Sequence, residues 1–136
     1  MTFSCGLNLI IGNKDANYYE ILKNIGDKFD DYCDVHDYQL ILKYLHKHDI
    51  TNFIVDNIFS ELHPGKHEEA AQKLHEIAVM SGKTIIATCY SPIAAGAIHP
   101  CYVYIADGDK IVGDIDEDLH PDNALTPDNI FSTYMI

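Results

Sequence analysis

The chain has 136 residues, the length of one ordinary domain, and its 47% hydrophobic and 22% charged residues are typical of folded proteins. Nine Lys, no Arg and 21 acidic residues give a net charge of −12. Nucleic-acid binders and proteins that dock on anionic lipid need clustered cations, so this balance excludes both classes.

The first half of the chain alternates apolar strands with helices whose apolar residues recur at helical spacing. The predicted elements are a strand at Leu7–Ile11, a helix at Asn17–Ile25, an acidic loop at Asp27–Asp37, a helix from Tyr38 and a strand at Asn52–Val55. The first strand ends at Gly12 and the second is followed by Asp56. Pro64-Gly65 then breaks the chain.

The second half continues this alternation and adds a hairpin. The predicted elements are a helix at Lys66–Met80, a strand at Thr84–Thr88, a short helix at Ser91–Ile98, strands at Cys101–Ile105 and Lys110–Val112, and a last helix from Thr126. Asp107-Gly108-Asp109 is a hairpin turn signal. The pattern predicts a single α/β domain over residues 1–136, with a mainly parallel sheet flanked by helices and a C-terminal hairpin and helix.

The segments at the strand ends resemble the nucleotide-binding domain of the ATP-binding cassette (ABC) ATPases, a P-loop NTPase fold. The matching segments are Gly12–Tyr19 for the P-loop, Phe53–Asp56 for the Walker B strand, Asn57–Pro64 for the catalytic Glu and D-loop, Lys83–Cys89 for the switch-histidine strand, Ile105–Asp114 for the terminal hairpin and Leu125–Ile130 for a following helix start. The resemblance covers most of the chain. A flavodoxin-like or other P-loop-like fold is the alternative.

The family's chemical residues are replaced throughout this resemblance. Gly12 survives, but Asn17 stands at the last P-loop Gly, Tyr18 at the Lys and Tyr19 at the Ser or Thr that holds Mg²⁺. Asn57 stands at the catalytic Glu, Cys89 stands at the switch His, and Asp56 is the one Walker B carboxylate. The signature motif is absent, and the chain is too short for the helical subdomain that carries it. The resemblance therefore implies a degenerate ABC-type domain with no cofactor and no ATPase activity, in which both tyrosines fill the phosphate site.

The remaining residues suggest two alternative functions. Cys89 with Asp56 could serve a small enzyme, although the only base suggested is His99. The acidic stretch Asp107–Asp128 could dock on a basic partner, as in an acidic, virus-encoded inhibitor or mimic. The main expectation is a regulatory protein that acts through a protein partner, with homo-oligomerisation left open.

No metal site is expected. His63 and His67 are separated by Pro64-Gly65, which argues against one helix presenting both. The group around His36 is better explained as a solvated acidic loop, since no set of residues has zinc-ligand spacing. The four cysteines lie far apart and no export signal or membrane-length apolar run is present, so we expect a cytoplasmic protein with free thiols.

Overall fold

A computed structural model describes residues 3–12, 15–29, 33–35, 38–47, 49–89 and 102–114. Its elements, in chain order, are β1 (Gly6–Gly12), α1 (Tyr18–Gly26), β2 (Cys33–Val35), α2 (Tyr38–Tyr44), β3 (Asn52–Val55), a 3₁₀ turn (Pro64–Lys66), α3 (His67–Ser81), β4 (Thr84–Thr88), β5 (Tyr102–Asp107) and β6 (Lys110–Asp114). Among these residues, no helix is long and apolar enough to cross a membrane.

The six strands form one mixed sheet in the order β2-β3-β4-β1-β5-β6. The first five strands pair in parallel, and β6 returns antiparallel to β5. The expectation of a mainly parallel α/β sheet with a hairpin is confirmed. A flavodoxin-like sheet places its first strand between the second and third. Here β1 lies between β4 and β5, so the flavodoxin-like alternative is wrong.

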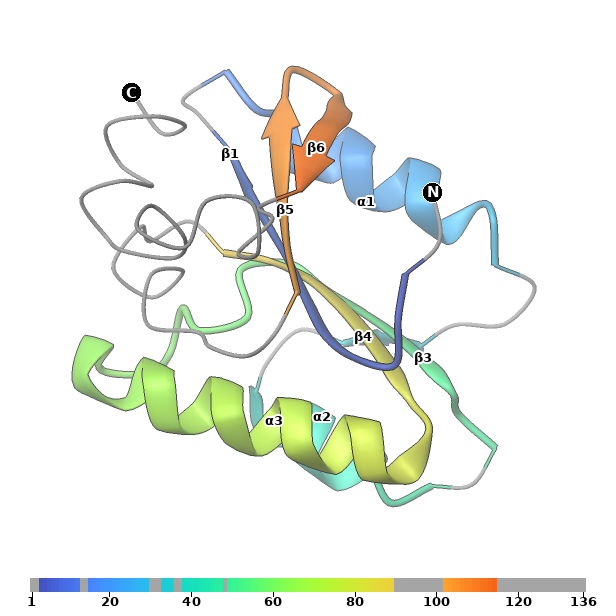
Figure 1. Ribbon diagram of the computed structural model, residues 1–136, viewed down its shortest axis with the longest axis vertical. Helices are drawn as coiled ribbons and strands as arrows, with labels where there is room; N and C mark the ends of the chain where they lie inside the picture. Colours follow the sequence, from blue (N-terminus) through green and yellow to red (C-terminus); the bar gives the residue numbers. More distant parts are fainter. Residues whose placement is uncertain are drawn as a thin grey trace.

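Side chains alternate between two cores because successive residues of a strand point to opposite faces. Leu7, Leu9 and Ile11 of β1 belong to one cluster with α2 and α3, whereas Ile10 belongs to a second cluster with α1. Figure 1 shows this layering, with α2 and α3 on one side of the curled sheet and α1 on the other. Of the described helices, α1 alone covers the second face.

Local signals explain where the helices start and stop. The side chain of Asn17 accepts a hydrogen bond from the Glu20 N–H and so caps the start of α1. α3 ends where Gly82 adopts a left-handed conformation with φ of 68°, the usual glycine stop of a helix. Both helices therefore begin and end within two residues of the positions expected from the sequence.

One expected loop contains a strand. The stretch Asp27–Asp37 holds β2, which pairs in parallel with β3 through Cys33 and Phe53. The acidic sequence hid this strand because three residues at a sheet edge need no apolar run and no alternating pattern. The predicted helices at Ser91–Ile98 and after Thr126 lie outside the described residues.

His75 contacts the first residues of β1, at the edge of the sheet opposite the carboxyl ends of the parallel strands. The Leu7 N–H donates to His75 Nδ1 over 3.0 Å. The His75 ring also meets the ring of Tyr102 edge-on, with 5.8 Å between centroids. A Cβ on Gly6, whose φ is 115°, would lie 2.6 Å from this histidine ring. His75 therefore completes the hydrogen bonding of β1 where β5 has not yet begun to pair.

Candidate functional site at the carboxyl ends of the strands

Gly12, Asp56 and Cys89 lie at the same edge of the sheet, as their strands require. β3 and β1 both run parallel to β4, with Val55 opposite Ala87 and Ile10 opposite Thr88. The Cys89 N–H extends this pairing by donating to the Ile10 carbonyl over 3.0 Å. In parallel α/β sheets this edge is where ligands bind, so the three positions form the candidate site.

A hydrogen-bonded group built on Thr88 organises the Asp56 side of the site. The Thr88 hydroxyl donates to Asp56 Oδ1 over 2.6 Å and accepts from the Asn57 N–H over 2.7 Å. Asn57 has a left-handed backbone with φ of 50°, a conformation that Asn tolerates better than most residues. The residue at the catalytic Glu position therefore shapes the turn after β3.

Thr88 is a site residue that the sequence reasoning missed. Its side chain is fully buried although its hydroxyl reaches the site. The available signal was a polar residue at the last position of an otherwise apolar strand, one residue before the switch position. Such a residue needs a hydrogen-bond partner when buried, and the partner here is the Walker B-like carboxylate.

Ala16 and Ala106 lie close to Gly12 at the end of β1. A Cβ at Gly12 would lie 2.6 Å from Ala16 Cβ and 3.0 Å from the Ala106 carbonyl oxygen. The Asn17 N–H donates to the Gly108 carbonyl in the β5–β6 turn over 2.6 Å. A working P-loop keeps its backbone N–H groups for phosphate. Here the hairpin turn takes the Asn17 donor, and Ala16 covers Gly12.

Tyr18 is half-buried at the start of α1 and packs against the cluster beneath this helix. Burial raises the pKa of Tyr18 above its usual value of about 10, and the negative charges of Cys89 and Asp56 add to that rise. A backbone hydrogen bond with Gly12 opposes it. The phenol therefore stays neutral at ordinary pH, and its hydrogen bond with Gly12 places it at the end of β1.

Tyr19 does not share this position. Its side chain is 74% exposed, which corrects the expectation that both tyrosines fill the phosphate site. Neighbouring helical residues point about 100° apart around the axis, so only one of two consecutive side chains can face the sheet. Of the two tyrosines, only Tyr18 packs against the sheet.

Cys89 is a buried thiol, with 1% of its surface exposed, and belongs to the core cluster beneath α2 and α3. Such burial is typical of a cysteine that serves the packing of the core. His99, the base considered for it, lies outside the described residues. A reactive thiol needs access as well as a base or cation to lower its pKa, and the described surroundings supply little access.

The histidines near the start of α3 also have structural roles. His63 Nδ1 accepts from the Gly65 N–H over 3.1 Å, and His67 Nε2 pairs with the Leu62 carbonyl over 3.0 Å. The ring of His67 is stacked on Phe59. Pro64–Lys66 forms a 3₁₀ turn, so one helix does not present both histidines. Within the described ranges, no three His, Cys, Asp or Glu side chains gather as metal ligands.

No protein-family model and no curated protein matches this sequence. The residues themselves therefore carry the functional argument.

Proposed function

We propose that this protein is an ABC-type core without ATPase activity that acts through contacts with a protein partner. The observation that carries the proposal is the position of Tyr18, which is half-buried against the cluster beneath α1 and hydrogen-bonds with the backbone of Gly12, where a P-loop has its lysine. A tyrosine there brings bulk where a P-loop has a lysine that neutralises phosphate.

The strand order also supports this proposal. The switch-like strand β4 lies between the P-loop-like strand β1 and the Walker B-like strand β3. That order brings the Thr88 hydroxyl beside Asp56. The segments that resemble the family's strand ends are therefore neighbours in the sheet, while the side chains that perform the family's chemistry are replaced.

Several losses act together against nucleotide binding. A lysine contact to phosphate is a charge-assisted hydrogen bond worth about 1.5–3 kcal/mol, and Tyr18 cannot replace it. The Asn17 N–H is already bonded to Gly108. Asn57 carries no carboxylate to act as a base. The net charge of −12 further opposes a triphosphate.

Calorimetric titration with Mg-ATP tests the first half of the proposal. We expect no binding at millimolar nucleotide and no phosphate release above the buffer rate. A micromolar dissociation constant, or phosphate release that Asp56→Ala abolishes, would overturn the proposal. A functional P-loop ATPase run in parallel shows that the assay detects binding when it occurs.

The partner is tested by affinity capture from the native host at low and high salt. We expect a stoichiometric protein whose binding survives moderate salt, since apolar contacts are not screened. Loss of the captured protein at high salt would favour the acidic-mimic alternative, because electrostatic binding weakens steeply with salt. Recovery of nothing but the chain itself would count against a partner and favour the enzyme alternative at Asp56 and Cys89.

A further inference from the structure

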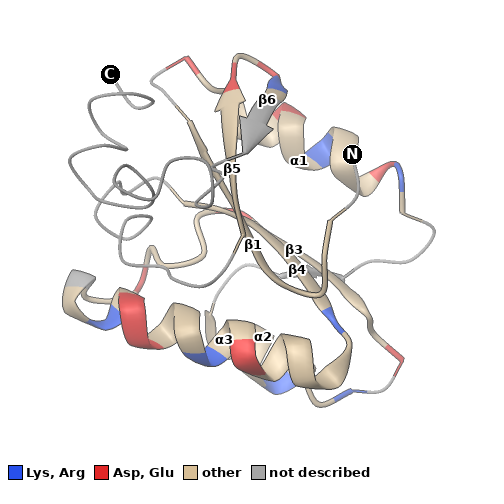
Figure 2. Ribbon diagram, in the orientation of Figure 1, with Lys and Arg blue, Asp and Glu red and all other residues tan. Residues whose placement is uncertain are grey.

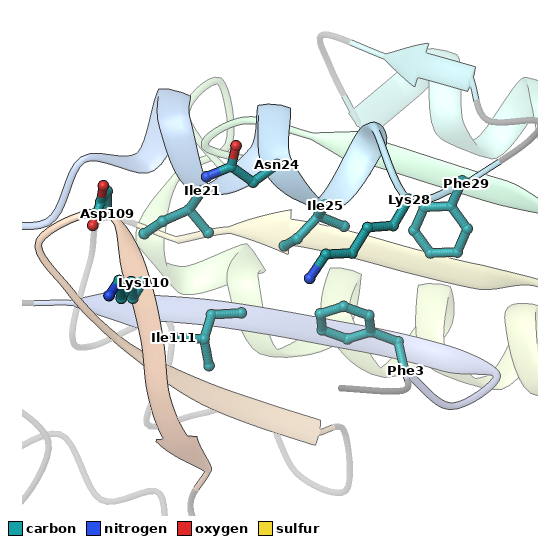
Figure 3. Close-up of a pocket in the computed structure, with 9 residues that line it drawn as sticks. All are labelled: Phe3, Ile21, Asn24, Ile25, Lys28, Phe29, Asp109, Lys110 and Ile111. Carbon is teal, nitrogen blue, oxygen red and sulfur yellow. The ribbon is translucent and has the colours of Figure 1, made fainter.

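The face of the sheet that α1 covers contains a groove of about 460 Å³, whose lining includes none of Gly12, Asp56 and Cys89. It lies between α1 and the β5–β6 hairpin (Figure 3). Its apolar lining consists of Phe3, Ile21, Ile25, Phe29 and Ile111. This volume falls within the usual range of small-molecule sites, about 300–1,000 Å³.

The apolar lining is built into the core and is therefore preformed. Ile21 and Ile25 belong to the buried cluster beneath α1, and Phe3 and Ile111 pack against that same cluster. The Phe3 ring meets the Tyr104 ring edge-on, with 5.1 Å between centroids. A ligand entering the groove would therefore meet side chains whose positions are already fixed by packing, which lowers the ordering cost of binding.

The charges at the groove differ from those of the protein as a whole. Its polar lining consists of Asn24, Lys28, Asp109 and Lys110. Two lysines and one aspartate stand here, in a chain where acidic residues outnumber lysines by 21 to nine. Figure 2 shows the mixed charges of the α1 and hairpin region. The groove is therefore a locally cationic site on an acidic protein.

The two lysines stand at different ends of the groove. Lys110 is next to Asp109 at the hairpin, so the two charges largely offset each other there. Lys28 extends from the end of α1 across the groove between Ile25 and Phe3 (Figure 3). Among the described residues no carboxylate pairs with it. Figure 3 therefore places the Lys28 ammonium beside apolar surface.

We propose that this groove binds a small amphipathic anion, with its carboxylate at Lys28 and its apolar body along Ile25, Ile21 and Ile111. At roughly 30 Å³ per water-sized group, the groove holds a ligand of about fifteen non-hydrogen atoms or fewer. A medium-chain fatty acid or an aryl carboxylate has this size and this distribution of charge. The ligand does not compete with nucleotide chemistry, because the groove shares none of the strand-end residues.

Octanoate is a suitable probe, and octanol is its neutral counterpart. Titration of the isotopically labelled protein followed by NMR should show saturable shifts of the Ile21, Ile25 and Ile111 methyl signals. A ligand of this size can reach a dissociation constant of about 1 mM. Octanol should bind at least about twofold more weakly, because an exposed ion pair contributes up to about fivefold.

Three variants test whether Lys28 binds the carboxylate and whether the ligand lies in the groove. Lys28→Gln should weaken octanoate about two- to fivefold and leave octanol unchanged. Lys23→Gln is the matched control, because Lys23 is an exposed lysine of the same helix that does not line the groove. Asn24→Trp, at an exposed position on the rim, should block the groove and abolish binding of both probes.

Three results would overturn the proposal. The first is no saturable shift at tens of millimolar octanoate, and the second is equal weakening by Lys28→Gln and Lys23→Gln. The third is a concentration-dependent dimer in sedimentation that Asn24→Trp dissociates, which would assign the groove to a second copy of this chain. None of these results depends on whether the protein binds ATP.

Discussion

Thr88 donates its hydroxyl hydrogen to Asp56 Oδ1 over 2.6 Å and so joins the ends of β4 and β3. The same hydroxyl accepts the Asn57 N–H. One fully buried side chain therefore fixes both the carboxylate and the turn that follows it. This group therefore holds together the carboxyl ends of the two strands.

Replacing Thr88 with Val should destabilise the protein by about 1–2 kcal/mol, because it removes two hydrogen bonds and leaves the shape nearly unchanged. Urea unfolding followed by circular dichroism measures the change. Thr84→Val, at the half-buried first residue of the same strand, should cost less than about 0.5 kcal/mol. Equal costs for the two variants would show that the Thr88 hydroxyl contributes nothing.

Gly12→Ala should destabilise the protein by about 1–3 kcal/mol, because the new Cβ would lie 2.6 Å from Ala16 Cβ. Gly65→Ala is the control, since its Cβ would come no closer than 3.4 Å to the neighbouring His63 ring. Thermal unfolding of both variants measures the difference. A neutral Gly12→Ala would mean that the chain after β1 is not packed over this glycine.

Tyr18→Phe should remove a phenol that ionises above the usual pKa of about 10, because the Tyr18 pKa is raised by burial and by Cys89 and Asp56. The difference in phenolate absorbance between wild type and variant during an alkaline titration isolates this one group. The raised pKa stabilises the folded state below about pH 10, and that contribution is lost as the pH rises further. If the absorbance step that the variant lacks occurs at or below pH 10 in the wild type, the burial assigned to Tyr18 would be contradicted.

His75 should make folding stability fall as the pH drops below about 6.5. Burial lowers the pKa of His75, so the unfolded chain takes up a proton before the folded chain does. Protonation would also remove the Nδ1 acceptor of the Leu7 N–H. Urea unfolding between pH 7 and about 5 should show a shallower decline for His75→Gln. The exposed His46→Gln should retain the wild-type decline, and identical slopes for all three proteins would refute this role.

Long apolar runs were enough to predict the sheet. Asn52–Val55 and Thr84–Thr88 are strands with the predicted ends, because each contains three consecutive buried apolar residues, which leave a continuous signal. Cys33–Val35 was missed because an edge strand of three residues carries no such run.

The candidate site was only partly predictable. Tyr18 stands three and seven residues before Ile21 and Ile25, so helical spacing places Tyr18, rather than Tyr19, on the face of α1 that packs against the sheet. The groove depends on residues far apart in the chain, such as Phe3 and Ile111, which come together only in the folded molecule. Sequence patterns within one element cannot report a relationship of that second kind.

The central position of β1 has a consequence for how the chain is made. Both of its neighbours come from the second half of the sequence, since Leu7 lies opposite Ile85 and Asn8 lies opposite Tyr102. On the ribosome, β1 therefore emerges about a hundred residues before both of its neighbours are present, a delay of some 5–20 s at ordinary elongation rates. During that time Leu7–Ile11 is an unpaired apolar strand that can aggregate or recruit a chaperone. A truncated chain that ends before β4 would leave this strand exposed permanently and should be degraded or insoluble.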